Sequence, residues 1–486
     1  MAKSGVHRAK TWEIALFAFN NTSTNLWMVM VNFVAYYLTG YVGVGVVLAS
    51  TLMTSMRIWD AVTDPLVGFI VDKTNGKFGK NRPFIAIGNI ILLVTTALMF
   101  FVTHHLPENF RLIYFIVIYL FYIIGYTCQT VVTKSAQSSL TNDPQQRPTF
   151  GIYDGIYNAI LFATYPVIVS NFLIPKYGGF TAELFANLWF IVAPLSTLFA
   201  WLAIFALKNK DREEFFGTGQ QVKVTFRDYW EVLKGNRAIQ MLVVSASTDK
   251  LGQTIRSNAT IMVIIYAIVC GNYGLQGGVA AYVTLPQLLI IFFGVKIWAQ
   301  RLGQRKALMI GSWGGIIANS LLFLLFYIGN PKTMALPGIE GFNGWTFFTV
   351  SFLILWVASA GFSSLASAMV IPMTADCADY EVYRSGKYVP GLMGTLFSSV
   401  DKIISSLGTT IIGLMCALAG YTADLPQVDS PYSESIKFVG LFCLCGFIII
   451  GYLCNIIAMK FYPLTKEKME EIQDEIARIK SEQVQS

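Results

Sequence analysis

Charged residues are scarce in this sequence. Only 13% of the 486 residues are charged and 55% are hydrophobic, whereas about a quarter of a soluble globular protein is charged. Apolar runs long enough to cross a bilayer, which takes roughly 20 residues each, recur along nearly the whole chain. The composition therefore excludes a soluble enzyme and indicates a polytopic membrane protein.

The residues of common catalytic and metal centres are also few. The three histidines, His7, His104 and His105, lie at loop or terminal positions, and the sequence contains no HExxH, GxSxG or phosphate-loop motif. The seven cysteines are odd in number and nearly all fall in apolar runs, which argues against a disulfide framework or a metal cluster. We therefore expect no enzyme, no cofactor and no metal other than a possible Na⁺.

We expect about twelve membrane-spanning helices. Their predicted ranges are 14–38, 43–72, 82–103, 111–137, 149–174, 183–207, 237–268, 277–298, 306–328, 345–376, 390–421 and 434–461. With an even number of spans, both termini lie on one side of the membrane. The loops after the even-numbered spans hold most of the lysines and arginines, which predicts cytoplasmic termini. This bias also accounts for the net charge of +7 without a nucleic-acid partner.

The longest polar interruption divides the chain into two halves. We predict an N-terminal bundle (1–207), a cytoplasmic middle loop (208–236), a C-terminal bundle (237–461) and a charged cytoplasmic tail (462–486) that forms a solvated helix. Short basic loops at 68–83 and 294–311 occupy matching positions in the halves; they are either ordinary positive-inside loops or marks of a duplicated six-helix unit. Duplication predicts an all-α major facilitator fold of two pseudo-symmetric six-helix bundles.

Two aspartates interrupt the second span in "SMRIWDAVTDPLVGF". A charge at bilayer depth costs about 2.5–3.5 kcal/mol and is expected to face the bundle interior. Asp60 and Asp64 share one helical face, and two like charges this close need a proton or a cation to neutralise them. Thr63 adds a hydroxyl oxygen suited to a hard cation. The alternative is an internal ion pair with Arg57 or with a lysine such as Lys402.

The stretches "RIWDAVTDPLVGFIVDKTNGKFGKNRPF" (57–84) and "MTADCADYEVYRSGKYVPGLMGTLFSSVDKIISSLG" (373–408) are distinctive. By these and by its tail, the chain resembles the glycoside–pentoside–hexuronide:cation symporters, over nearly its whole length. The resemblance implies that Asp60 and Asp64 are the cation-site carboxylates, that Thr127 is a hydroxyl joining them, and that Lys402 is the coupling lysine of the eleventh helix.

The chain also departs from the family pattern. Sodium-using melibiose permeases have asparagine where this chain has Thr63, so protons are at least as plausible a coupling ion as Na⁺. The sugar-binding aspartates of the galactoside carriers are absent, and Thr130 occupies one of their positions. What remains on the first helix is a polar cluster that includes Asn20, Asn21 and Thr24, which either binds sugar hydroxyls or links helices.

Extra charges on or near the spans bear on the substrate. Lys134 and Arg256 suit an acidic sugar such as a hexuronide or a sulfonated sugar, because arginine can bind an acid group bidentately. Alternatively, Asp154, Asp249 and Lys250 pair with the basic groups and leave no free positive charge. Tyr126 either stacks on a sugar ring or serves packing. The candidate substrate residues are Asn20, Asn21, Thr24, Tyr126, Thr130, Lys134, Asp154, Arg256 and Lys402.

These features predict a symporter that moves a sugar or glycoside across the bacterial inner membrane, coupled to H⁺ or Na⁺ by alternating access. The lipid bilayer and the sugar are the only partners we expect, with no obligate protein partner. The alternatives within transport are a uniporter or an exchanger. A sensor that binds sugar without moving it is a further alternative, although such proteins typically carry an added soluble domain.

Overall fold

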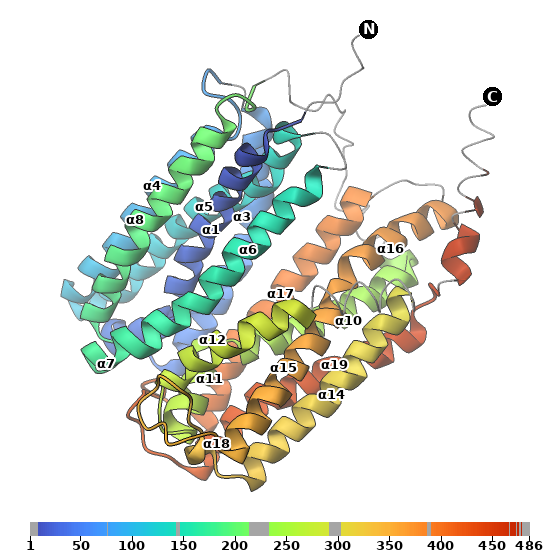
Figure 1. The fold of residues 1–486 in the computed structure, drawn as a ribbon. Helices are drawn as coiled ribbons and strands as arrows, with labels where there is room; N and C mark the ends of the chain where they lie inside the picture. The colour runs from blue at the N-terminus through green and yellow to red at the C-terminus, as the bar shows by residue number, and fades with distance from the viewer. Residues whose placement is uncertain are drawn as a thin grey trace. The chain divides into compact units, whose positions relative to one another are not determined.

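The computed structural model describes residues 8–74, 76–141, 146–212, 233–290, 303–385 and 390–465, and in the tail 467–472, 474, 475 and 478. Within these ranges the regular elements are helices, and no β-strand is present. The chain forms two compact units, each a bundle of helices (Figure 1). Unit 1 comprises Met1–Gln220 and Cys416–Ser430, and unit 2 comprises Gln221–Met415 and Pro431–Ser486.

Unit 1 is built from the N-terminal helices. They are α1 (Thr11–Val31), α2 (Val34–Tyr37), α3 (Val46–Lys73), α4 (Arg82–Ala97), α5 (Glu108–Leu140), α6 (Arg147–Val167), α7 (Ile174–Tyr177) and α8 (Ala182–Leu207). α1 packs on α8, α6 and α5; α3 packs on α5; and α4 packs on α5 and α8. Gly88 and Gly125 let α4 and α5 approach closely, since a Cβ on Gly88 would lie 2.8 Å from the Gly125 carbonyl oxygen.

Unit 2 repeats this pairing. Its helices are α10 (Arg237–Arg256), α11 (Ala259–Met262), α12 (Gly274–Leu289), α14 (Gln304–Ile328), α15 (Phe347–Ala368), α16 (Val370–Ser385), α17 (Pro390–Leu418), α18 (Glu434–Leu441) and α19 (Phe447–Phe461). α10 packs on α19, α14 on α15, and α14 on α19, which are the counterparts of the pairs that α1, α4, α5 and α8 make in unit 1. Polar side chains begin several of these helices; Asn236, Thr346 and Ser433 accept hydrogen bonds from backbone N–H groups of the first turn.

Helical residues occupy each predicted span, except that 291–298 lies outside the described residues. By length and apolarity, 8 described helices could each cross a membrane, or 9 if the bent pair Ala259–Val269 and Gly274–Leu289 is one span. α10 does not pass this test because it carries many polar residues. A total of twelve crossings therefore stays a prediction.

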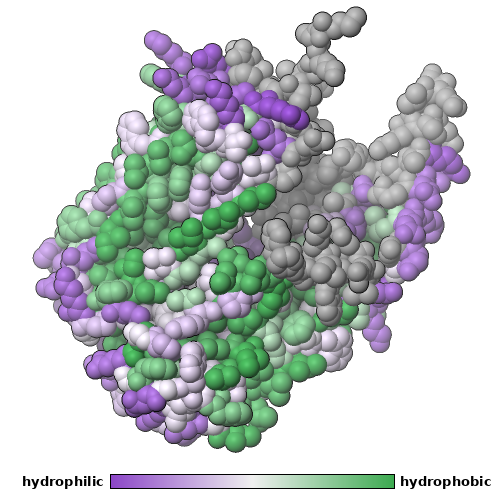
Figure 2. Space-filling view, in the orientation of Figure 1, coloured by the Kyte–Doolittle hydropathy of each residue, from purple (hydrophilic) through white to green (hydrophobic). Residues whose placement is uncertain are grey.

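The surface agrees with a membrane setting. Figure 2 shows hydrophobic side chains over the flanks of the helices and hydrophilic ones gathered near helix ends and loops. Large apolar residues such as Leu66, Phe69 and Ile113 are more than half exposed. Exposed apolar area on this scale is expected where lipid, rather than water, surrounds the protein.

Residues 467–472 of the tail are helical and Glu467, Glu470 and Glu471 are exposed, as predicted for a solvated helix, but one side of the helix packs on unit 2. Ile472 is fully buried, and it joins a core cluster of unit 2 with Tyr462 and Leu464. Among the described tail residues, Lys468 pairs with Glu471 and Arg478 pairs with Glu475; each pair is three residues apart. The sequence did not predict that Ile472 packs on unit 2, because charged residues outnumber apolar ones in the tail. The predicted middle loop and the second basic loop lie largely outside the described residues, so the domain boundaries remain predictions.

Candidate functional site

α3 carries the predicted cation-binding residues. Asp60, Thr63 and Asp64 lie within one unbroken helix, and their spacing puts all three on one side of it. Thr63 is buried, and both aspartates are half-buried. Pro65 follows directly and has no amide hydrogen, so the Ala61 carbonyl lacks the donor it would normally have four residues later. Acceptor oxygens are therefore concentrated on this part of the helix.

Thr127 on α5 joins these oxygens. Its hydroxyl donates a hydrogen bond to Asp60 Oδ1 at 3.1 Å and lies 3.3 Å from the Thr63 hydroxyl. The Thr63 hydroxyl is 3.1 Å from the Asp60 backbone carbonyl oxygen, to which it donates. Carboxylate and hydroxyl oxygens are the ligands that hard cations prefer, and a carboxylate can equally take up a proton. We call Asp60, Thr63, Asp64 and Thr127 the α3–α5 cluster.

A row of tyrosines on α5 runs beside the α3–α5 cluster. The ring centroids of Tyr119 and Tyr122 are 5.3 Å apart, and those of Tyr122 and Tyr126 are 6.2 Å apart. All three side chains are within electrostatic range of Arg57 and Asp60. The sequence analysis singled out only Tyr126. The spacing of three and four residues, which puts all three on one face, could have revealed the other two.

A second polar cluster links α1 to α6. Asn21 and Asn158 both donate side-chain hydrogen bonds to Asp154 Oδ1, at 2.8 Å and 3.0 Å, and Asn25 donates to Asn158 Oδ1 at 2.7 Å. We call Asn21, Asn25, Asp154 and Asn158 the amide cluster. In the described part of the chain no basic side chain forms an ion pair with Asp154, so amides rather than a cation stabilise this carboxylate. The sequence analysis missed Asn158, which follows Asp154 by one helical turn.

Asn20 and Thr24 lie deeper, between α1 and α5. Both are 0% exposed. Asn20 donates to the Gln129 carbonyl at 3.0 Å and to the Thr133 hydroxyl at 2.7 Å, while Thr24 donates to the Asn20 carbonyl and to Gln129 Oε1. These bonds correspond to the helix-linking alternative that the sequence left open for this cluster.

The remaining predicted residues are dispersed. Thr130 donates to the Thr127 carbonyl of its own helix at 3.1 Å, and Lys134 is an exposed residue of α5. Lys402 is a half-buried residue of α17 in unit 2. Their roles in binding and coupling stay predictions.

Arg256 lies in the interior of unit 2 at the end of α10. Its guanidinium donates to Asn319 Oδ1 at 3.1 Å and to the Ser359 hydroxyl at 2.7 Å, and it lies 4.1 Å from the ring centre of Trp356. The residue is 7% exposed, yet no carboxylate among the described residues forms an ion pair with it. Neutral acceptors and an aromatic face therefore hold this cation, in contrast to the ion-pair alternative.

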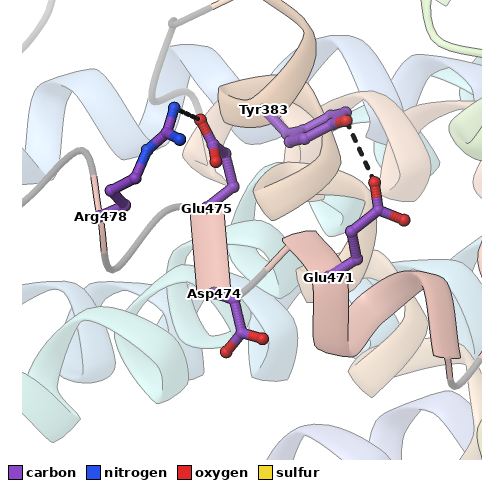
Figure 3. Close-up of a pocket in the computed structure, with 5 residues that line it drawn as sticks. All are labelled: Tyr383, Glu471, Asp474, Glu475 and Arg478. Carbon is purple, nitrogen blue, oxygen red and sulfur yellow. Dashed lines mark hydrogen bonds and ion pairs between the residues drawn. The ribbon is translucent and has the colours of Figure 1, made fainter.

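A separate hollow of about 500 Å³ lies beside the tail. It is lined by Tyr383, Glu471, Asp474, Glu475 and Arg478. Figure 3 shows Arg478 and Glu475 pointing toward each other and the Tyr383 hydroxyl pointing at Glu471, at 3.4 Å. This hollow contains none of the predicted site residues; Arg478 pairs with Glu475 within it, and Glu471 pairs with Lys468 beside it.

A family model described as MFS/sugar transport protein matches residues 21–466, which is most of the chain. The chain belongs to this family. With its relatives it lies among the glycoside–pentoside–hexuronide:cation symporters, as the resemblance implied. The family consists of transporters, which confirms the expectation that the chain is not an enzyme.

Three curated relatives cover nearly the whole chain. The "Glucuronide carrier protein homolog" of Escherichia coli (strain K12) is 24% identical and is matched over 93% of this chain and 92% of its own length. The "Isoprimeverose transporter" of Lactiplantibacillus pentosus is 23% identical, over 93% and 88%. The "Putative glycoside/cation symporter YagG" of Escherichia coli (strain K12) is 23% identical, over 94% and 93%.

Solved structures confirm the fold class. The crystal structure of the nucleoside transporter NupG has a TM-score of 0.62 at 14% identity, covering 94% of this chain and 99% of that one. A bacterial homologue of the lysosomal transporter Spinster, in an inward-facing and unoccupied conformation, has a TM-score of 0.59 at 12% identity, covering 93% and 95%. The protein is thus an all-α, multi-pass membrane transporter of the major facilitator superfamily.

Proposed function

We propose that this family member is a symporter that carries a sugar or glycoside across the bacterial inner membrane, coupled to H⁺ or Na⁺. The observation that carries the proposal is the α3–α5 cluster, where two carboxylates and two hydroxyls share one side of a membrane helix. The names of two relatives, "Putative glycoside/cation symporter YagG" and "Inner membrane symporter YicJ", support the same function and location. We retain cytoplasmic termini as part of the proposal.

The chemistry of the α3–α5 cluster explains how a cation would act. Asp60 and Asp64 are one helical turn apart, so their two charges repel unless a proton or a cation is bound. Binding would draw oxygens of α3 and α5 together around one positive charge. In the coupling cycle that we propose, Lys402 neutralises the carboxylates of the empty carrier and is displaced when the cation binds. The carrier then reorients only when it is empty or when it holds both cation and sugar.

The amide cluster and the tyrosine row are the proposed sugar ligands of unit 1. Amide groups both donate and accept hydrogen bonds, as sugar hydroxyls do. Asn21, Asn25 and Asn158 are partly buried and keep bonding capacity beyond the hydrogen bonds already described, and Tyr126 offers an aromatic face. We assign Asn20 and Thr24 to holding α1 against α5, so they would position the sugar site rather than line it.

Transport by an Asp64 variant tests the symport proposal. Asp64→Cys should abolish accumulation driven by an imposed H⁺ or Na⁺ gradient while the protein remains in the membrane, because one carboxylate of the pair is lost. Ser55→Ala is the matched control, since Ser55 lies on the same helix and, among the described residues, its side chain bonds only to the Thr51 carbonyl. Uptake would be measured in right-side-out vesicles with each gradient imposed alone. Undiminished accumulation by Asp64→Cys would overturn the proposal.

An acidic sugar is the substrate class that the charges favour. Arg256 and Lys134 make no ion pair among the described residues, so neither charge is cancelled by Asp154 or Asp249. The name of the relative "Glucuronide carrier protein homolog" points to the same class. In this proposal the Arg256 guanidinium binds the acid group of the sugar, because arginine binds carboxylates and sulfonates with charge-assisted hydrogen bonds.

A substrate panel tests this choice. Vesicles would be offered a hexuronide, a sulfonated sugar, a pentoside and a neutral glycoside. Losing one charge-assisted hydrogen bond costs about 1.5–3 kcal/mol, so Arg256→Gln should raise the KM for the acidic sugar by roughly 10- to 100-fold. Arg237→Gln, at the other end of the same helix, is the control. If Arg256→Gln lowers folding stability but leaves the order of substrates unchanged, Arg256 is a core arginine that ties α10 to α14 and α15.

A further inference from the structure

Asp249 is a buried carboxylate on α10 of unit 2 and is not part of the α3–α5 cluster. It lies twelve residues after the start of α10 at Arg237, which is about 18 Å along the helix axis at 1.5 Å per residue. The residue is 7% exposed. It therefore lies well inside a helix bundle, where an ionised carboxylate is costly unless hydrogen bonds or a cation compensate it.

That compensation is largely missing. The Ser367 hydroxyl of α15 donates to Asp249 Oδ2 at a long 3.3 Å, and no described donor makes a hydrogen bond to Oδ1. Gln253, one turn further along α10, lies beside the carboxylate, but its side-chain amide donates to the Ser363 hydroxyl at 2.6 Å. One weak hydrogen bond compensates only a small part of the desolvation cost of a buried negative charge.

A second orphaned polar group lies in the same place. Tyr452 on α19 is fully buried, and its hydroxyl makes no hydrogen bond of good geometry although Ser363, Gln253 and Asp249 are close by. Gly451 permits this arrangement, because a Cβ there would lie 2.9 Å from the Thr248 carbonyl oxygen and 3.3 Å from Asp249 Cα. α19 thus presses directly on the backbone of the aspartate.

The surrounding charges do not neutralise Asp249. Lys250 on α10 and Asp401 on α17 are within electrostatic range, with opposite effects, and α15 and α19 contribute the hydroxyls of Ser363, Ser367 and Tyr452. Arg256 lies two turns away on the same helix and is held by Asn319 and Ser359. No described basic side chain forms an ion pair with Asp249.

We propose that Asp249 is a proton-binding site of unit 2, with Ser367, Gln253 and Tyr452 as its hydrogen-bonding surroundings. Taking up one proton converts the carboxylate into a neutral carboxylic acid. The acid has an O–H donor, which the carboxylate lacks, and a neighbouring oxygen of Gln253 or Tyr452 can accept from it. Its use in coupling rests on the proposed symport, since Asp249 would then give unit 2 a titratable carboxylate of its own, in addition to Asp60 and Asp64 of unit 1.

Infrared difference spectroscopy on the purified protein in lipid tests the proton site without transport. A buried carboxylic acid gives a carbonyl-stretch band that an ionised carboxylate lacks. We expect this band at neutral pH in the wild type, its loss in Asp249→Asn, and its retention in Asp154→Asn, which changes the half-buried carboxylate of unit 1 that has two amide donors. Tyr452→Phe should shift the band, because a hydrogen-bonding neighbour of the acid is removed.

An Asp249→Asn spectrum that matches the wild-type spectrum would overturn the proposal. If Asp249→Asn does not fold, the wild type still decides: a hydrophobic carbodiimide, which reacts with protonated buried carboxyls, should label the peptide that contains Asp249, and absence of label there refutes the site. Neither measurement needs a gradient or a substrate. Failure of the symport assay and failure of the proton site are therefore separate results.

Discussion

A half-buried carboxylate on a helix of unit 1 and a buried carboxylate on a helix of unit 2 have different hydrogen-bond donors. In unit 1, Asp154 receives hydrogen bonds from two amides on α1 and α6, both at 3.0 Å or less. In unit 2, Asp249 is more deeply buried and receives one hydroxyl hydrogen bond at 3.3 Å. The two acids thus differ both in depth of burial and in the donors that reach them, and each of these affects whether a carboxyl group is charged.

Carboxylates at helix ends are satisfied in both units. Asp211, which follows α8, accepts hydrogen bonds from the backbone N–H groups of Lys80, Asn81 and Arg82 and so caps the start of α4. In unit 2, Glu381 accepts from Arg384 and Asn236. Asp211, Asp154 and Asp249 therefore form a series of decreasing hydrogen bonding, and the following predictions test that series.

The largest loss of stability is expected at Asp211. Asp211→Ala removes a buried acceptor and leaves several N–H groups unpaired, so it should lower the free energy of unfolding by about 3 kcal/mol. Denaturant unfolding in detergent would measure the loss. Asp211→Asn is the control, since it keeps the shape and one acceptor oxygen and should cost less. Equal stability of Asp211→Ala and the wild type would show that the cap contributes nothing.

A smaller loss is expected at Asp154. Asp154→Ala leaves the Asn21 and Asn158 amides without their shared acceptor, at a cost of about 1–3 kcal/mol. Asp154→Asn should cost less, because both amides bond to the same oxygen and a neutral carbonyl can replace it. The same unfolding assay applies. Equal stability of the alanine and asparagine variants would show that the acceptor oxygen shared by the two amides does not stabilise unit 1.

The smallest effect is expected at an exposed ion pair of the tail, which lies outside this series. Lys468 hydrogen-bonds Glu471 at 2.6 Å, which lowers the pKa of Glu471 and raises the pKa of Lys468. Because the pKa of Glu471 is lowered, the pair stabilises the tail at pH values above the ordinary glutamate pKa of about 4.3. This stabilisation is lost as pH falls through the pKa of folded Glu471. The raised pKa of Lys468 means that the pair's stabilisation is fully present below the ordinary lysine value of about 10.4 and is lost as pH rises through the pKa of folded Lys468.

Hydrogen exchange of residues 467–472 would detect this pair. Glu471→Gln should exchange about twofold faster than the wild type at neutral pH, in keeping with a solvent-exposed pair. Comparing the two proteins at each pH cancels the intrinsic pH dependence of exchange, and their ratio should fall to one in acid. A ratio that is independent of pH would show that the ion pair has no part in docking the tail.

The sequence by itself determined the class of this protein. Long apolar runs with few charges have one stable arrangement in lipid, the helix, because the bilayer offers no partner for unpaired backbone groups. The positions of Asp60, Thr63 and Asp64 on one face followed from helical periodicity alone. The motifs at 57–84 and 373–408 indicated the family, which the match to residues 21–466 confirms.

Only the tertiary structure decided which polar groups meet. Asn20 and Asn21 are neighbours in sequence, yet one is enclosed between α1 and α5 and the other bonds Asp154 on α6. Arg256 and Asp249 share α10 but have different partners: Arg256 donates to Asn319 and Ser359, whereas Asp249 accepts from Ser367. A side chain's bonding depends on what the neighbouring helices place opposite it, and that arrangement comes from packing between segments far apart in the chain, which periodicity along one helix does not encode.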